Sequence, residues 1–307
     1  MCELAGVSRA SFYRHWARQE PAAAEVELRA AVQRLSLAHR HYGYRRIAVL
    51  VQEEGLAAGA KTVRRLMREE NLLALRRRRF AVTTDSDHTF RVWPNLAQYL
   101  ELTDINQLWV ADLTFLRLEE EFVYLAVVLD AYSRRVIGWA LDRAMTGSLT
   151  MKALEGALAL RRPSPGFVHH SDQGSQYACV EYVDLLERSG AVLSMSRAGR
   201  PWENGRCESF IKTLKQEEID ARPYRTIEEL EAHVEEFIEQ VYNSVRLHSA
   251  LAYRSPVESE QQHSSSSQAA AWLPASRSFL RHREISSDVL DPTCRDEQNA
   301  RPGHSSE

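Results

Sequence analysis

Features of several protein classes are missing from this sequence of 307 residues. No apolar run approaches the roughly 20 residues that a membrane-spanning helix needs, so we expect no membrane protein. The first residues, MCELAGVSRASFY, lack a basic stretch followed by an uninterrupted apolar one, so we expect no secretory signal peptide. These absences favour a cytoplasmic protein.

Cysteine is scarce, and its four residues lie far apart, at Cys2, Cys179, Cys207 and Cys294. The sequence has no CxxC pair and no dense cysteine spacing, which excludes a disulfide scaffold. Histidine pairs occur, but no cysteine pair accompanies them at zinc-site spacing. We therefore expect no zinc site.

The net charge of −3 hides an uneven distribution of charge along the chain. Residues 1–100 contain 17 Lys and Arg against 10 Asp and Glu, which leaves 22 against 32 for residues 101–307. A local cluster of basic side chains attracts phosphate whatever the total charge is. The front of the chain is therefore the candidate DNA-binding region.

Residues 25–78 repeat apolar side chains with the period of a helix, with breaks at HYGYRR and EEGLAAGAK. We expect three helices that form a small helix-turn-helix-like domain, within a basic DNA-binding region over residues 1–80. The third helix has four basic residues at spacings of three and four, and an arginine run follows it. The candidates for DNA contact are Lys61, Arg64, Arg65, Arg68, Arg76, Arg77, Arg78 and Arg79. A solvated helix face is the alternative for the first four.

A second domain is expected over residues 104–260, after a polar linker over residues 81–103. Three alternating segments with short connections, LWVADLTFLRL, EFVYLAVVLD and RRVIGWAL, predict an antiparallel meander. Helices near 148–160, 180–189 and 204–216 then alternate with the short strands GFVHHS and AVLSM, which implies parallel pairing. The order βββαβαβα predicts a ribonuclease H-like α/β fold, with a mixed five-stranded sheet flanked by helices.

Two regions complete the second half of the chain. A last amphipathic helix is expected near residues 226–243, and it ends in YNSVRLHSALAYRSPVE. The Ser-rich and sparsely apolar sequence that follows predicts a disordered tail over residues 261–307.

Three carboxylates occupy positions where this fold could bring them together. Asp112 lies inside an otherwise apolar strand, where a charge is costly unless a cation or hydrogen bonds satisfy it. Asp172 closes the fourth strand, at the carboxyl end where α/β sheets build their sites. Glu208 lies in the helix after the last strand. The first and fourth strands of such a sheet are neighbours, so we expect Asp112, Asp172 and Glu208 to form a catalytic site.

Three carboxylates suit Mg²⁺ or Mn²⁺, which prefer hard oxygen ligands and keep positions open for water and phosphate. Two such ions could activate the attacking oxygen and stabilise the leaving oxygen during displacement at phosphorus. The same three residues are therefore the expected metal ligands. The alternative is that each carboxylate is a structural exception without catalytic role.

Several long motifs in order resemble one known family. The segments WVADLTFL, HHSDQGSQY, SMSRAGRPWENGRCESFIKTLKQE and YNSVRLHSAL resemble those of the OrfB transposases of the IS-three insertion-sequence family, which are related to retroviral integrases. The resemblance covers about residues 1–258 and implies that Asp112, Asp172 and Glu208 are the catalytic triad of a DDE transposase. The 35 residues between Asp172 and Glu208 are typical of that family. Glu203 is a departure, because an aspartate usually precedes Asn204 in the family, and reduced activity could follow.

The resemblance also implies partners and supporting residues. Lys215 matches a basic residue seven positions after the glutamate, on the same helix face, where it could contact DNA phosphate. OrfB chains of this kind act fused to an upstream OrfA, so we expect OrfA, DNA and a homo-oligomer on DNA as partners. The expected supporting residues are Asn204, Trp202, Arg246 and His248. Trp202 could stack on a base or cover the core, and Arg246 and His248 could contact DNA or support the fold.

His169 and His170, at the end of the fourth strand, could orient the site or simply pack.

Three functions remain open from the sequence. The first is a transposase that cuts DNA at the ends of an insertion sequence and joins the freed 3′-hydroxyl to another phosphodiester. The second is a related nuclease or resolvase that only hydrolyses. The third is a DNA-binding regulator without catalysis. The intact carboxylate set argues against the third, and the long motifs favour the first.

Overall fold

The computed structural model describes residues 8–10, 23–74 and 91–271. Arg76, Arg77, Arg78 and Arg79 lie outside the described residues, as do most of the first 22 residues and the expected tail from residue 272 onward. No helix in the described ranges has both the length and the apolar character that crossing a membrane requires.

Three helices form the basic region near the front of the chain: α2 (Ala23–Ala38), α3 (Tyr44–Glu53) and α4 (Ala60–Glu69). Their apolar faces share one buried cluster, in which Val32, Ile47 and Val63 have no exposed surface. Gly55, with a φ of 83°, makes the turn between α3 and α4 in the left-handed region that favours glycine. The helical periodicity of the sequence therefore predicts these elements correctly.

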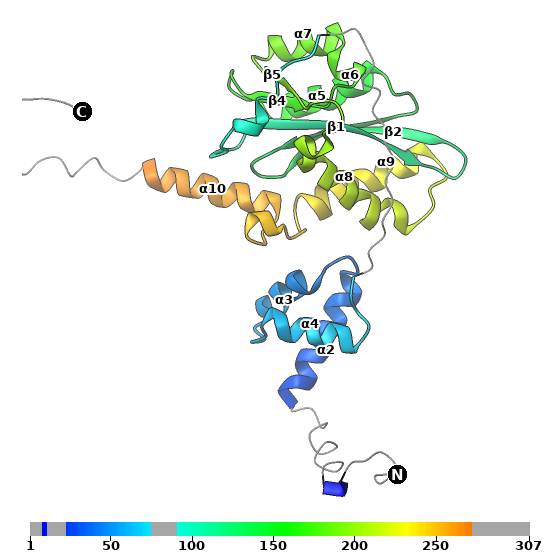
Figure 1. Ribbon diagram of the computed structural model, residues 1–307, viewed down its shortest axis with the longest axis vertical. Coiled ribbons are helices and arrows are strands. Elements are labelled where there is room, and N and C mark those ends of the chain that lie inside the picture. The colour runs from blue at the N-terminus through cyan, green and yellow to red at the C-terminus, as the bar shows by residue number, and fades with distance from the viewer. Residues whose placement is uncertain (1–7, 11–22, 75–90, 272–307) are drawn as a thin grey trace, which may run out of the picture. The chain divides into compact units, whose positions relative to one another are not determined.

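A five-stranded mixed sheet forms the centre of the second region (Figure 1). Its strands are β1 (Leu108–Arg117), β2 (Phe122–Asp130), β3 (Val136–Asp142), β4 (Val168–Ser171) and β5 (Val192–Met195). The spatial order is β3-β2-β1-β4-β5. The first three strands pair antiparallel as a meander, whereas β4 pairs parallel with both β1 and β5. The ribonuclease H-like α/β fold expected from the sequence is confirmed.

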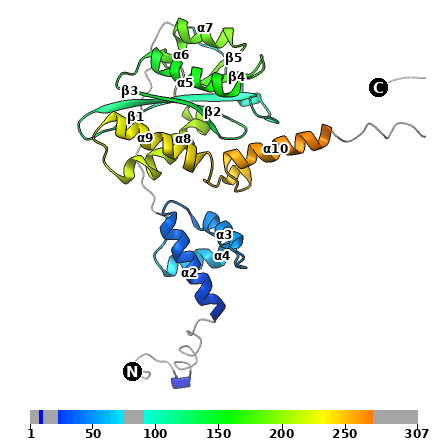
Figure 2. The same ribbon diagram turned by 180° about the vertical axis from the view of Figure 1, so that it is seen from behind.

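Helices cover both faces of this sheet (Figures 1 and 2). Helices α5 (Gly147–Arg161), α6 (Ser175–Ala178) and α7 (Val180–Arg188) lie on one face, around a core that contains Trp109, Leu154 and Tyr182. Helices α8 (Gly205–Glu217) and α9 (Ile227–Glu236) lie on the other face, around a core that contains Val110 and Phe210. Strands β1, β2 and β3 therefore separate two cores, with alternate side chains in each.

Close packing of α5 on β3 depends on one glycine. A Cβ atom at Gly138 would come within 2.2 Å of the carbonyl oxygen of Ala153 and 2.8 Å of the Cβ of Ala157. Real Cβ atoms do not approach backbone so closely, so any larger residue at this position would push the helix from the sheet.

The linker expected over residues 81–103 packs on the sheet region in its second half. Trp93 packs against the core that contains Trp109, and Leu102 packs against the other core. The segment includes one short turn of helix, η1 (Ala97–Tyr99). Residues 91–103, which we expected to belong to a linker, thus contribute to the core.

The last helix expected from the sequence, near residues 226–243, is partly α-helical and partly π-helical. Helix α9 continues as a π-helical turn, η4 (Phe237–Tyr242), after which Asn243 bonds to the start of β3. Its side-chain amide accepts from the backbone N–H of Val136 at 3.0 Å and donates to the carbonyl of the same residue at 3.0 Å. Asn243 therefore takes the place of a neighbouring strand at the edge of the sheet.

A further helix, α10 (Pro256–Ala271), crosses residue 261, where the sequence led us to place the start of a disordered tail. Pro256 stands at its first position, and Ser255 and Glu258 exchange hydrogen bonds between their side chains and backbone N–H groups. This is a capping box, a local arrangement that starts helices. The remaining short helical turns are η3 (Ile219–Ala221) and η5 (Ser249–Leu251).

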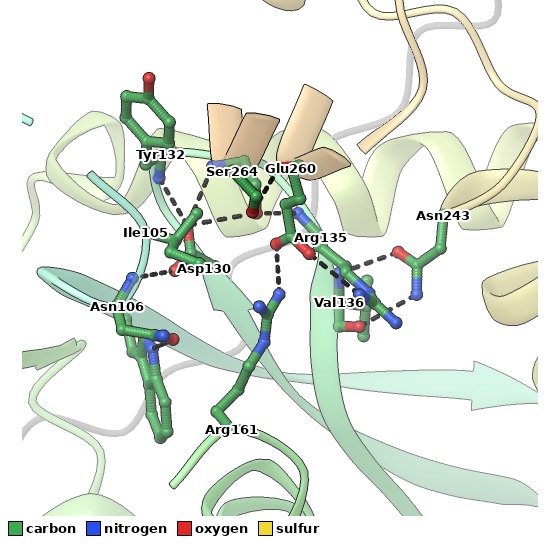
Figure 3. A network of polar contacts seen from close by, with 12 residues as sticks. Ile105, Asn106, Asp130, Tyr132, Arg135, Val136, Arg161, Asn243, Glu260 and Ser264 are labelled. Carbon is green, nitrogen blue, oxygen red and sulfur yellow. Dashed lines mark hydrogen bonds and ion pairs between the residues drawn. The ribbon is translucent and has the colours of Figure 1, made fainter. Parts of the chain in front are cut away.

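A buried carboxylate holds α10 to the sheet region, as Figure 3 shows. Glu260 binds Arg161 at the end of α5 and Arg135 in the turn between β2 and β3, the latter at 2.9 Å. The side chains of Glu260 and Arg161 are each only 9% exposed. Because so little water reaches these charges, each depends on the other for its stabilisation.

Replacing Glu260 by Ala should lower the free energy of unfolding by about 3–5 kcal/mol, because two arginines would be left without their buried partner. The matched control is Glu235→Ala, which removes an exposed glutamate of α9 and should change stability by less than about 0.5 kcal/mol. Urea denaturation followed by circular dichroism measures both. Equal stability of the two variants would show that Glu260 does not hold the helix.

Candidate active site

Two of the predicted catalytic carboxylates are neighbours because of the way in which β1 and β4 pair. Val110 of β1 lies opposite His170 of β4 in parallel register, so Asp112 and Asp172 follow on adjacent strands. One carboxylate oxygen of Asp112 accepts from the N–H of Leu113 at 2.9 Å, and one of Asp172 accepts from the N–H of Gly174 at 3.0 Å. Both side chains are partly buried. The pairing of the two strands therefore puts these two aspartates at neighbouring positions of the sheet.

The charge of Asp112 is poorly stabilised in its position. Burial raises the pKa of Asp112 well above its ordinary value, and the negative charge of Asp172 raises it further. Glu208 adds to the increase, whereas the N–H of Leu113 and the charge of Lys215 oppose it. Such a raised pKa means that a cation bound here would relieve electrostatic repulsion.

Glu208 lies in the first turn of α8 and is exposed. Partial burial of its carboxyl group raises the pKa of Glu208, and the negative charge of Glu208 raises the pKa of Asp112. Among the residues that the structure describes, however, no three His, Cys, Asp or Glu side chains form a group that could hold a metal ion. The structure thus brings two carboxylates together and keeps the third in their electrostatic vicinity, short of the full convergence that we expected.

The residues at this site nevertheless fit a divalent cation. Their ligand atoms are carboxylate oxygens, the type that Mg²⁺ and Mn²⁺ prefer. Burial, and then the negative charge of Asp172, raise the pKa of Asp112, so a bound cation would stabilise its charged form.

Helix α8 is bonded to β1 next to Asp112. The side-chain N–H of Asn204 donates to the carbonyl of Ala111 at 2.9 Å, and the thiol of Cys207 donates to the carbonyl of Val110 at 3.4 Å. Asn204 is 4% exposed, and Glu208 follows it by about one helical turn. We expected a supporting role for Asn204. Its side chain attaches the start of α8 to β1.

Lys215 lies on the same helix and is directed back toward the site. Its ammonium nitrogen is 4.4 Å from the centre of the Phe115 ring, a cation–π contact. Burial lowers the pKa of Lys215, whereas the charge of Asp112 raises it. Phe115 was not among the residues expected from the sequence, since an aromatic residue in a strand gives no sign of which cation it contacts.

Trp202 and Glu203 belong to a short helical turn, η2 (Pro201–Asn204), that leads into α8. Trp202 is 68% exposed, so it does not cover the core. Glu203 binds the backbone and the guanidinium of Arg197 at 2.5–2.9 Å. The glutamate that departs from the family pattern is therefore a bonded residue of the loop before α8.

His169 and His170 are buried and hydrogen-bonded. His169 pairs with the hydroxyl of Tyr182 at 3.0 Å, and Nδ1 of His170 pairs with the hydroxyl of Ser194 at 2.9 Å. Burial lowers the pKa of His169 to about 3 and that of His170 to about 4. Both are therefore neutral at pH 7 and support the sheet, which is the packing alternative.

Arg246 and His248 are also buried, with 6% and 8% of their surfaces exposed. Arg246 donates three hydrogen bonds to the carboxylate of Glu217 at the end of α8, the shortest at 2.7 Å. His248 packs edge-to-face on Tyr242, and burial lowers its pKa to about 3. Of the two alternatives for this pair, these contacts favour support of the fold over contact with DNA.

The four basic residues predicted on the third helix, now α4, are all exposed: Lys61, Arg64, Arg65 and Arg68. They differ in their surroundings. Arg65 forms ion pairs with Glu69 at 2.9 Å and Glu25 at 3.2 Å, and Arg64 lies over the Tyr44 ring. The exposed face exists as expected, but part of its charge is neutralised within the bundle.

Comparison with known families matches most of the chain. The family described as "Integrase core domain" matches residues 103–201, and a second family with the same description matches residues 189–256. The family described as "HTH-like domain" matches residues 23–80. The helical region is therefore a helix-turn-helix-like DNA-binding domain, and the sheet region is an integrase core.

Individual relatives agree with these families. A 31 kDa protein of insertion element IS600 from Shigella sonnei is 38% identical, over 83% of this chain and 96% of its own length. The transposase of IS904 from Lactococcus lactis is 34% identical, over 80% of this chain and 99% of its own. Transposase InsF of IS3A from Escherichia coli is 33% identical, over 85% and 92%.

Among solved structures, the magnesium-bound catalytic core domain of HTLV-2 integrase is 17% identical, with a TM-score of 0.40, over 51% of this chain and 97% of that one. The family is identified from the sequence relatives, because the matches extend over almost the whole length of each relative. This chain belongs to the transposase family of insertion sequences that includes InsF of IS3, and it is a polynucleotidyl transferase of the DDE type.

Proposed function

We propose that this transposase cuts DNA at the ends of its insertion sequence and joins the freed 3′-hydroxyl to target DNA, with Asp112, Asp172 and Glu208 as its catalytic residues. The single observation that carries this assignment is the parallel pairing of β1 with β4, which puts Asp112 beside Asp172. Burial and the charge of Asp172 raise the pKa of Asp112 there, in agreement with the assignment. Glu260, by contrast, is paired with arginine.

The three carboxylates would hold Mg²⁺ or Mn²⁺, and we propose two ions. When bound, the ions supply an activated attacking oxygen and stabilise the leaving oxygen of the phosphodiester. The chain's own residues orient this chemistry: Asn204 fixes α8 beside Asp112, and Phe115 holds the Lys215 ammonium near the carboxylates. Lys215 would bind a DNA phosphate there, and the exposed Trp202 would stack on a base.

The partners of the protein follow from the same family. DNA binding is a property of the helix-turn-helix-like domain, to which Lys61, Arg64, Arg65 and Arg68 contribute exposed charge. We propose that an OrfA protein, fused or separate, supplies further DNA contacts, and that several copies of the chain assemble on DNA. The arginine run from Arg76 to Arg79 would add to the phosphate contacts.

Single replacement of Asp112 or Asp172 by Asn, or of Glu208 by Gln, should reduce both cleavage and joining by more than about 100-fold, since removing even a group that only hydrogen-bonds to a metal ligand costs about 10- to 100-fold. The control is Asp184→Asn, which changes an exposed aspartate on α7. Gel assays with labelled element ends, in Mg²⁺, in Mn²⁺ and with chelator, measure both steps. Full activity in any of the three variants would remove that residue from the assignment.

Replacement of Lys215 by Ala should slow strand transfer by about tenfold or more while leaving overall DNA affinity within about twofold, because the variant no longer holds one phosphate at the reacting centre. Lys152→Ala, on the opposite face of the sheet, is the control. Strand transfer under single-turnover conditions and fluorescence anisotropy of labelled DNA give the two quantities. A fall in affinity equal to the fall in rate would show that Lys215 only binds.

Changing Arg64, Arg65 and Arg68 together to Ala should weaken DNA binding and flatten its salt dependence by about 0.9 for every DNA phosphate that the variant no longer neutralises. Arg65 should contribute less than Arg68 to this change, since Glu25 and Glu69 already neutralise it. Anisotropy titrations at several salt concentrations measure the slopes, with Arg188→Ala on α7 as control. Identical slopes for wild type and the triple variant would mean that this face is only solvated.

A further inference from the structure

The carboxylate of Glu203 is the centre of a cluster of hydrogen bonds beside the active site. Oε2 accepts from the side-chain N–H of Asn95 at 2.7 Å and from the backbone N–H of Arg197 at 2.9 Å. Oε1 accepts from two guanidinium nitrogens of Arg197, at 2.8 and 2.5 Å. The side chain of Glu203 is 6% exposed, whereas that of Arg197 is 51% exposed. Each oxygen of this buried carboxylate therefore accepts two hydrogen bonds.

These bonds join two segments that lie far apart in the sequence. Arg197 and Glu203 stand at the two ends of the loop between β5 and α8, so their pairing closes that loop on itself. Asn95 belongs to the segment before β1. Two further bonds reinforce the connection: Arg197 donates to the side-chain oxygen of Gln98 at 3.1 Å, and the N–H of Leu96 donates to the hydroxyl of Ser194 at 2.9 Å.

The same loop ends where the catalytic helix begins. Asn204, the next residue, bonds to the carbonyl before Asp112, and Glu208 lies about one turn farther along α8. Trp202, within the loop, is exposed. A change in the position of Glu203 would therefore move both the helix that carries Glu208 and the aromatic side chain beside it.

The electrostatics agree with this arrangement. Burial alone would raise the pKa of Glu203, but hydrogen bonds from Arg197 and Asn95 outweigh it and lower the pKa to about 2. The carboxylate is thus charged at any pH at which the protein would work, and its charge is matched by Arg197. Arg197 is in turn committed to the loop, which leaves it less able to bind DNA phosphate.

We propose that Glu203 is a positioning residue, whose carboxylate fastens the loop of residues 196–204 to the segment of residues 95–98 and so sets the place of Glu208 and Trp202 during strand transfer. The expected effect on strand transfer rests on the proposed function. The attachment of the loop does not depend on that function. The family's aspartate at this position keeps the charge with a shorter reach. A glutamine keeps the size but removes the charge.

Limited trypsin digestion of the full chain tests the fastening without reference to activity. Cleavage after Arg197 should be at least about tenfold faster in Glu203→Gln than in wild type, because the loop opens locally more often. Glu203→Asp should restore part of the protection, and Glu187→Gln, an exposed change on α7, should have no effect. Equal cleavage rates in wild type and Glu203→Gln would overturn the proposal.

Strand-transfer kinetics on the same variants test the consequence for chemistry. Glu203→Gln should lower kcat by about tenfold or more with little change in KM for DNA, since positioning acts on the reacting geometry. Asn95→Ala, which removes one bond and leaves the Arg197 pair, should give a smaller decrease in kcat. A rise in KM with unchanged kcat would overturn the proposal in favour of a DNA-contact role.

A failure of the proposed function would give different results from a failure of the role proposed for Glu203. In that case wild type would show no metal-dependent transfer, while the difference in trypsin cleavage would still be present. Should Glu203→Gln fail to fold, Glu203→Asp and Asn95→Ala decide the question by the same two measurements. Unchanged cleavage in both would overturn the fastening.

Discussion

The parallel pairing of β1 with β4 is the constraint on which the active site depends. Strand β1 pairs antiparallel with β2 on one side and parallel with β4 on the other, so it joins the meander to the α/β half of the sheet. Val110 lies opposite His170, and Asp112 and Asp172 each come two residues later, so the two aspartates lie side by side. A shift of one residue in this pairing would turn Asp112 to the opposite face of the sheet, away from α8. The bonds from α8 to β1 then extend the arrangement to Glu208.

Three carboxylates of the protein are stabilised in two different ways. Glu260 lies between arginines, and Glu203 receives four hydrogen bonds; each has a lowered pKa, so each is stabilised as an anion by its surroundings. Asp112 has a raised pKa and lies among other carboxylates, with Lys215 as an opposing charge. The first kind holds segments together, and the second stores electrostatic free energy that a ligand can release.

Local patterns in the sequence predict the strands, the main helices and the neighbouring aspartates, because periodicity and element order are properties of short segments. They do not predict the fastening of the loop before α8, since Asn95 and Glu203 are separated by 108 positions and leave no repeating pattern. The helix α10 was missed for a related reason. Its Ser-rich composition suggests disorder, while the capping box at Ser255 and the buried pairing of Glu260 favour the helix. Nor could the sequence indicate that Glu208 is exposed, or that the described residues contain no group of three such side chains able to hold a metal ion.

The π-helical turn at Phe237–Tyr242 has a consequence for the chain length in this region. A π-helical turn accommodates one more residue than an α-helical turn, so residues after it are rotated by about 100° from the phase of an uninterrupted α-helix. Asn243 meets the backbone of Val136 in this rotated phase. Deleting one residue from the turn would restore a regular helix and direct the amide away from the edge of β3. The number of residues between α9 and Asn243 is therefore fixed by helical phase, so insertions and deletions should be tolerated there less readily than substitutions.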